Sequence, residues 1–256
     1  MARASPELKK TLTPDLLESV HQLWFGHCLD ENSLVLPSQN EMQRWFTRDA
    51  DFDEACVAQF RPVLELILTS EASATDILET INTASPFSWL YTLLLLDQIP
   101  RNCYRGSESK VVFTRFDPLA SAIAMRAIEN RIFSQSSELR YRLAYRMWFY
   151  LPLMHSEELK MHEKALEQYE IKASELEELV DRDVDTLSED ERKYHRVLSG
   201  RRDELKTFLA MNTEFEKKHK VIIERFGRYP HRNEALGRTS TPEEVEYLQS
   251  GGETFA

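Results

Sequence analysis

Apolar side chains recur with the spacing of an α-helix along almost the whole chain. Thr13 and Pro14 supply an N-cap and a first helical residue, and the apolar positions after them lie three or four residues apart until Gly26. Patterns of the same kind predict the remaining helices, namely one that ends at Phe46, one that begins at Phe52, an almost wholly apolar one over Pro86–Leu96, one opened by Asp117 and Pro118, two long ones over Ser156–Val180 and Ser188–Phe226, and a short one capped by Thr241. We therefore predict an all-α protein.

The chain offers little material for a β-sheet. The longest β-rich stretch is Val111–Phe113, and 7 glycines and 10 prolines among 256 residues are too few for the frequent turns of a sandwich or barrel. Short links between long helices favour antiparallel helix pairs. The predicted organisation is a single helical domain over residues 1–256, with a disordered N-terminal tail at residues 1–12.

The composition narrows the range of partners and compartments. The net charge is −11, which disfavours nucleic-acid binding by the protein as a whole, although Arg101–Arg146 holds nine bases and four acids. No apolar run is long enough for a membrane span, and the N-terminus lacks the apolar core of a secretion signal. Cys28, Cys56 and Cys103 share no close spacing. These features predict a cytoplasmic protein that does not bind membranes.

The sequence contains none of the compact motifs for a cofactor or a metal ion. It has no G-x-G-x-x-G or Walker A string for phosphate groups, and no H-x-x-x-H or H-E-x-x-H pattern for zinc. We therefore expect neither a cofactor nor a metal site.

Three segments break the helical pattern with polar residues, and functional sites tend to occur at such breaks. In the first, the apolar helix ends in Asp97 and Gln98, followed by Arg101 and Asn102. A bare carboxylate next to the core is costly unless it is paired, and Arg101 is the nearest partner. The segment is therefore either a buried ion pair at a helix end or the floor of a polar pocket.

The second segment places His155, Ser156 and Glu157 directly after an aromatic-rich stretch. His155 is a candidate general base oriented by Glu157, and Ser156 is a candidate nucleophile. In the simpler alternative, Ser156 caps the next helix and Glu157 interacts with the positive end of its dipole.

The third segment crowds basic and amide side chains into a loop with two glycines and a proline. Guanidinium groups suit carboxylates and phosphates, so an anion or polar-ligand pocket is favoured over an arginine–carboxylate network that ties the last helix to the core. The candidate binding residues of this segment are Arg228, His231, Arg232, Asn233 and Arg238.

The same segments resemble the family known as domain of unknown function 924, over nearly the whole chain. The matching strings are Trp24-Phe25-Gly26, Leu96-Asp97-Gln98 with Pro100-Arg101-Asn102, His155-Ser156-Glu157, Arg225-Phe226-Gly227-Arg228 with Pro230-His231-Arg232-Asn233, and Leu236-Gly237-Arg238. One departure is His162, where the family commonly has glutamine. The resemblance implies an all-helical, tetratricopeptide-like array of antiparallel helix pairs.

The resemblance also implies a possible activity, since some fungal proteins similar to this family are arginine-containing cyclodipeptide synthases. Such an enzyme takes aminoacyl groups from charged tRNA, so its partners would be aminoacyl-tRNA and an amino-acid or other small-molecule substrate. Asp97 or Glu157 would receive the substrate guanidinium, and His155 or His231 would act as the base. Two alternatives stay open: a non-catalytic binding module for a peptide or carboxylate, and an enzyme on a small anionic substrate.

Overall fold

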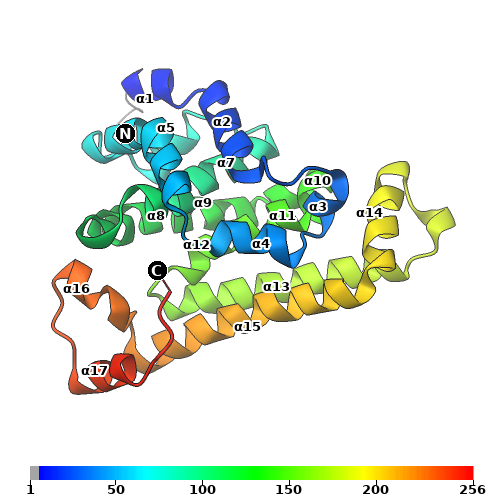
Figure 1. Ribbon diagram of the computed structural model, residues 1–256. Helices are drawn as coiled ribbons and strands as arrows, with labels where there is room; N and C mark the ends of the chain where they lie inside the picture. The colour runs from blue at the N-terminus through cyan, green and yellow to red at the C-terminus, as the bar shows by residue number, and fades with distance from the viewer. Residues whose placement is uncertain (1–5, 256) are drawn as a thin grey trace.

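All regular structure in residues 6–255, the part described by the computed structural model, is helical (Figure 1). The predicted capping signals start helices in the structure: the Thr13 side chain caps α2 (Pro14–Phe25), and capping boxes begin α14 (Glu189–Gly200) and α17 (Pro242–Gln249). Capping boxes also begin α4 (Gln39–Phe46) and α6 (Ala74–Leu78), where the sequence analysis predicts none. The all-α prediction is confirmed.

The apolar helix predicted over Pro86–Leu96 lies in the middle of the core. It forms α7 (Pro86–Leu93) and continues into a π-helical turn, η1 (Leu94–Gln98), whose three leucines have no exposed surface. Two helices, α2 and α9 (Asp117–Glu129), pack against it. The long α5 (Ala50–Thr69) packs against the following helix α8 (Ile99–Cys103), and the short α12 (Leu151–Met154) packs against α9.

The other elements among residues 6–158 are short. They are α1 (Pro6–Thr11), α3 (Glu31–Val35), α8 (Ile99–Cys103), η2 (Gly106–Ser109), η3 (Val112–Phe116), η4 (Ile132–Ser134), α10 (Ser137–Tyr141), α11 (Leu143–Arg146) and η5 (Met147–Phe149). The disordered tail predicted for residues 1–12 is wrong from residue 6 onward, because α1 is helical and Leu8 is buried in the core. Residues 1–5 lie outside the described part.

Two long antiparallel helices, α13 (Leu159–Asp181) and α15 (Arg202–Phe226), lie side by side beneath this core (Figure 1). The single helix predicted over Ser188–Phe226 is instead α14 and α15. The break falls at Arg201, whose φ of −123° and ψ of 36° interrupt the helix directly after Gly200. The link between α13 and α14, which contains η6 (Val184–Thr186), is acidic and mostly exposed, as expected.

The chain after α15 folds back toward the core as a small C-terminal unit, which we define as residues 227–255. It contains η7 (Pro230–Arg232), α16 (Asn233–Leu236) and α17, and its end returns to the side of α12 (Figure 1). Gly227 ends α15 in the left-handed region at φ 67°, a conformation that glycine adopts at little cost. None of the helices in residues 6–255 is long and apolar enough to cross a membrane.

The contact between α13 and α15 buries a lysine amino group that has no acidic partner among residues 6–255. Lys172 is 1% exposed, donates to Oδ1 of Asn212 at 2.9 Å, and lies among the rings of Tyr150, Tyr169 and Phe208. Burial therefore lowers the pKa of Lys172 well below its ordinary 10.5. The unfolded chain therefore keeps a proton on this side chain up to a higher pH than the folded chain does.

We expect the double variant Lys172→Met, Asn212→Leu to unfold with a free energy about 1–2 kcal/mol higher at pH 7, because both polar partners are removed together. Urea titration measures this. The wild-type free energy of unfolding should rise with pH between neutrality and 10.5, and the variant should lose that rise. Lys172→Met alone should gain less, since Asn212 then remains buried and unpaired; an equal gain would contradict the argument.

Candidate functional site

Two π-helical turns place acidic residues at the centre of the molecule. Asp97 lies within η1, two residues before the Ile99-Pro100 start of α8, and Asp117 follows η3 directly and precedes Pro118. A proline ring clashes with the carbonyl four residues earlier and cannot donate to it, and a wider π turn accommodates that defect. The two prolines thus explain why the helices widen at these acids.

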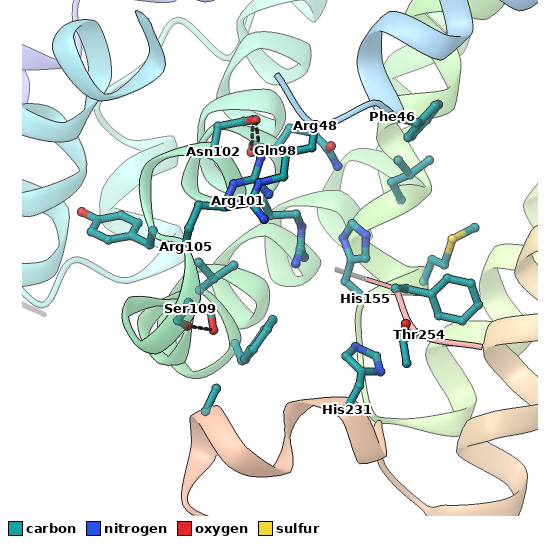
Figure 2. A pocket seen from close by; sticks show the side chains of 18 of the residues that line it. Phe46, Arg48, Gln98, Arg101, Asn102, Arg105, Ser109, His155, His231 and Thr254 are labelled. Carbon is teal, nitrogen blue, oxygen red and sulfur yellow. Dashed lines mark hydrogen bonds between the residues drawn. The ribbon is translucent and has the colours of Figure 1, made fainter. Parts of the chain in front are cut away.

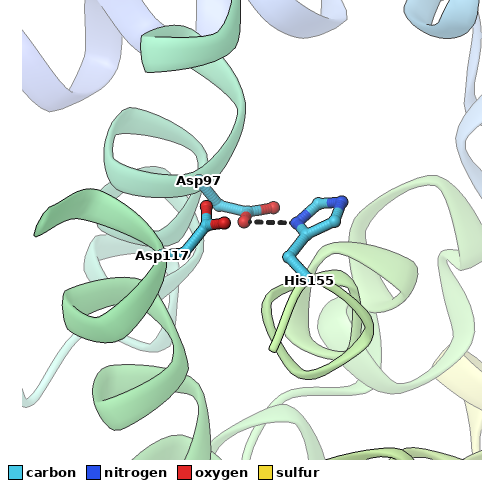
Figure 3. Close-up of side chains that lie close together, drawn as sticks. All are labelled: Asp97, Asp117 and His155. Carbon is cyan, nitrogen blue, oxygen red and sulfur yellow. Dashed lines mark hydrogen bonds and ion pairs between the residues drawn. The ribbon is translucent and has the colours of Figure 1, made fainter. Parts of the chain in front are cut away.

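Asp97 and His155 form the central pair of the site (Figure 3). Oδ1 of Asp97 lies 2.7 Å from Nδ1 of His155, and the Gln98 amide donates to its Oδ2 at 2.5 Å. Asp97 is 1% exposed, yet its pKa is lowered, because His155 and Arg101 outweigh the effect of burial. The pKa of His155 is lowered by burial and by Arg101, so its ring is neutral near pH 7.

Two guanidinium groups surround the second carboxylate. Arg101 donates to Asp117 at 2.5 Å and lies 3.5 Å from Asp97, and Nη1 of Arg232 lies 3.3 Å from Oδ2 of Asp117. Arg232 also donates to the backbone carbonyl of His155 at 3.0 Å. Arg101 of the first sequence segment and Arg232 of the third therefore meet at Asp117, and Arg232 also contacts His155 of the second segment.

The ligand atoms of Asp97, Asp117 and His155 lie within 4.8 Å of one another (Figure 3). This spacing suits a metal ion, but the positions around the carboxylates are taken by Arg101 and Arg232. Two fixed positive charges at the same carboxylates oppose a third. We therefore assign the cluster as an ion-pair network. The expectation that the protein has no metal site stays a prediction.

A cavity of about 900 Å³ opens beside His155 (Figure 2). Arg101 and Arg105 lie on one side of it, and His155 and His231 lie on the other. Neither buried ring nitrogen of His231 has a hydrogen-bond partner among residues 6–255, and burial lowers the pKa of this residue to about 4. The predicted binding residues Gln98 and Asn102 also line the cavity, as do aromatic rings, which are those of Trp24, Trp45, Phe46, Tyr104, Phe113, Phe215 and Phe255.

Several predicted site residues do not line this cavity. Glu157 accepts two hydrogen bonds from Arg238, at 2.9 and 2.7 Å, and one from the Tyr229 amide at 3.0 Å. Arg228 is paired with Glu244 in a bidentate contact. These contacts form the arginine–carboxylate network that was the alternative interpretation of the third segment.

Ser156 and Asn233 are also occupied by local contacts. The Ser156 hydroxyl accepts from the backbone amide of Glu158, which is itself the N-cap residue of α13, so Ser156 does not cap that helix. Asn233 is 2% exposed and donates to Ser240 and Glu244 within the C-terminal unit. His155, rather than Glu157 or Ser156, is the residue of the second segment that faces the cavity, and Asp97 rather than Glu157 holds its ring.

Four charged residues of the site are not singled out in the sequence analysis, and these are Arg48, Arg105, Asp117 and Glu234. In the sequence, Asp117 indicates only the start of a helix, which is the ordinary role of an Asp-Pro pair. Arg48 and Glu234 line the cavity and are exposed, and neither has an ion-pair partner among residues 6–255. An arginine just after the predicted Trp45–Phe46 helix end was the available signal for Arg48. Nothing in the sequence distinguishes Glu234 from other surface acids.

Comparisons with known proteins identify relatives without an assigned activity. The model of a family described as bacterial protein of unknown function (DUF924) matches residues 20–252. The chain is similar to the solved structure of a protein of unknown function from Agrobacterium tumefaciens, with 27% identity and a TM-score of 0.58, over 93% of this chain and 98% of that one. No curated protein matches the chain.

Proposed function

The chain belongs to the DUF924 family, and we propose that it is an enzyme in which His155 transfers a proton to or from a small substrate. The substrate is held in the adjacent cavity by an anionic group. The observation that supports this proposal is the arrangement of one imidazole between a buried acid and an open cavity. Nδ1 of His155 contacts Asp97, and no group of residues 6–255 bonds to its Nε2.

This arrangement suits a general base near neutral pH. Asp97 is ionised and accepts the Nδ1 proton, which leaves the lone pair of Nε2 available. The imidazolium formed by proton transfer is stabilised by the same carboxylate. A lowered pKa of His155 keeps the ring neutral and ready to accept a proton at pH 7.

The charges on the cavity wall support an anionic substrate group. Arg101 is neutralised by Asp97 and Asp117, and Arg105 by Asp53 at 2.7 Å. Arg48 has no such partner among residues 6–255, so its guanidinium is available to a carboxylate or phosphate. Phe46, next to it along the wall, offers an apolar surface to the rest of the molecule.

Inorganic phosphate is a simple probe of this anion site. We expect phosphate to shift the amide NMR signals of residues around Arg48. Arg48→Ala should raise the dissociation constant of phosphate about tenfold, which is the effect of losing one charge-assisted hydrogen bond. Arg44→Ala is the matched control, because Arg44 is exposed in the last turn of α4, four residues before Arg48, but does not line the cavity. Equal weakening by both variants would indicate general surface charge and count against the site.

The finer proposal is aminoacyl transfer from charged tRNA to form an arginine-containing cyclodipeptide. It is favoured by one cation and one carboxylate on the wall of the same cavity, Arg48 and Glu234, neither of which has an ion-pair partner in the described part of the chain. Asp97 and Glu157 are already bound to other side chains. Glu234 is therefore the residue that we assign to the substrate guanidinium, and His155 would deprotonate the attacking amine.

Metabolite profiling of cells that express the chain tests both levels of the proposal. We expect a small molecule to appear or disappear with the wild type and not with His155→Gln, whereas His195→Gln on α14, away from the cavity, should behave as the wild type. A diketopiperazine that contains arginine would support aminoacyl transfer, and in vitro formation from charged tRNA should then fall steeply with salt. Identical profiles for wild type and His155→Gln, with phosphate still bound, would favour a binding module.

A further inference from the structure

Three consecutive backbone carbonyls at His155 each accept a hydrogen bond from a different side chain. The Tyr229 hydroxyl donates to the carbonyl of Met154 at 2.6 Å, and Nη1 of Arg232 donates to that of His155 at 3.0 Å. Nε2 of His162 contacts the carbonyl of Ser156 at 2.9 Å. These carbonyls follow the last turn of α12, where the helix itself provides no donor. The backbone that carries His155 is therefore held by side chains on both sides.

The third donor is itself held by a buried acid. Nδ1 of His162, on α13, lies 2.6 Å from Oε1 of Glu216, on α15, and neither side chain has exposed surface. The other carboxylate oxygen of Glu216 is buried without a hydrogen-bond partner. A carboxyl–imidazole pair thus recurs seven residues after His155, with its Nε2 directed at a carbonyl instead of at a cavity.

We propose that His162 and Glu216 are positioning residues, which fix the Ser156 carbonyl and so hold the His155 ring against Asp97. The proposal rests on the proposed function, since it gives this pair a role in the proton transfer by His155. A carbonyl can only accept a hydrogen bond, so Nε2 of His162 carries a proton. The contact between Nδ1 and Glu216 then requires one further proton, located on either partner.

The surroundings of His162 and Glu216 favour the pair with this further proton present, in which the two side chains together carry no net charge. The titratable groups that face it are Tyr169 on α13, His219 on α15 and Tyr229 on the C-terminal unit. Burial raises the pKa of both tyrosines and lowers that of His219 to about 3, so all three are neutral near pH 7. Burial also raises the pKa of Glu216. Loss of the shared proton would leave an uncompensated charge in this apolar environment.

Loss of the hydrogen bond from His162 should change the backbone conformation at Ser156 and, through it, the position of the His155 ring. A partly buried carbonyl without a donor is unfavourable, so the segment would reorient to find one. Arg238 still holds the adjacent Glu157 and Arg232 still holds the His155 carbonyl, so the change falls on the backbone of Ser156, directly after His155. The His155 ring would then meet water more often and hold Asp97 less well.

The experiment is NMR of the full chain labelled with ¹⁵N-histidine, with no substrate present. The His155 ring signals are assigned with His155→Gln. In the wild type we expect His155 as the Nδ1–H tautomer with a pKa below 6.5, and His162 protonated at Nε2. His162→Leu should move the pKa of His155 up toward 6.5 and produce a mixture of tautomers.

His162→Gln should keep the wild-type signals of His155, because a side-chain amide can still donate to the Ser156 carbonyl. His195→Leu on α14 is the control for loss of a histidine elsewhere. Unchanged His155 signals in His162→Leu would overturn the proposal. So would an Nδ1–H tautomer of neutral His162 in the wild type, which requires no variant to fold.

These signals distinguish the proposal from the proposed function. If the NMR result is as expected and His155→Gln leaves the metabolite profile unchanged, His162 positions a ring that is not catalytic. If His155→Gln abolishes the metabolite change while His162→Leu leaves the His155 signals alone, the catalytic role stands and the positioning role fails.

Discussion

Asp117→Asn is expected to lower the free energy of unfolding by about 3–5 kcal/mol, because it leaves two guanidinium groups without their shared carboxylate. Asp117 is 5% exposed and Arg232 is 4% exposed, so water cannot replace the lost contacts. Arg101 keeps only its longer contact with Asp97, at 3.5 Å. Urea titration followed by circular dichroism measures the change, with the m-value showing whether unfolding remains two-state.

The matched control is an ion pair of the same chemistry on the surface. Asp181 and Arg202 lie 2.6 Å apart, with side chains that are 66% and 47% exposed. Asp181→Asn should change the free energy of unfolding by less than about 1 kcal/mol, because exposed pairs contribute little. A similar small change for Asp117→Asn would mean that the central network does not hold the core and the C-terminal unit together.

The helices were largely predictable because their signals are local. Thr13 with Pro14, Ser188 with Glu191, and Thr241 with Glu244 mark helix starts in sequence and form those caps in the structure. The break at Arg201 was missed because the apolar spacing continues across it, so periodicity alone does not register a change of helix direction. The preceding Gly200 was the available stop signal.

The residues at the site were partly predictable because polar groups next to apolar runs are unusual. Asp97, Arg101 and His155 were selected on that basis, and the structure brings them together. Their partners were not predictable, since pairing depends on how distant segments pack. Glu157 follows His155 by two residues, yet the acid that contacts the His155 ring is 58 positions away.

The residues of the third segment have two different roles in the structure, which are to pair with carboxylates and to line the cavity. Arg238 binds Glu157 and attaches the C-terminal unit to the core, Arg228 binds Glu244 within that unit, and His231 faces the cavity. Arg232 pairs with Asp117 and also contacts the His155 carbonyl. Sequence composition shows that arginines are numerous in this segment, but only packing shows which of them are neutralised.

Asp97→Asn is expected to lower the rate of the reaction, measured as formation of the metabolite that depends on His155, by about 10²–10⁴-fold, the contribution typical of a general base. The side-chain amide that replaces the carboxylate can donate as well as accept, so it no longer requires a proton on Nδ1 of His155. The ring can then carry its proton on Nε2, the nitrogen that has to accept a proton in the reaction. The paired experiment is Glu157→Gln. It removes a charge that does not contact the His155 ring, and should reduce stability more than rate.

The pH dependence of the same reaction identifies the role of His155. Burial and Arg101 lower the pKa of His155, so a base-catalysed rate should be constant above pH 6.5 and fall at lower pH as the ring gains a proton. Because the Asp97 carboxylate raises the pKa of His155, Asp97→Asn should move this fall to still lower pH. A rate that instead falls as pH increases through this range would mean that the protonated ring is the active form, and His155 would then act as a general acid.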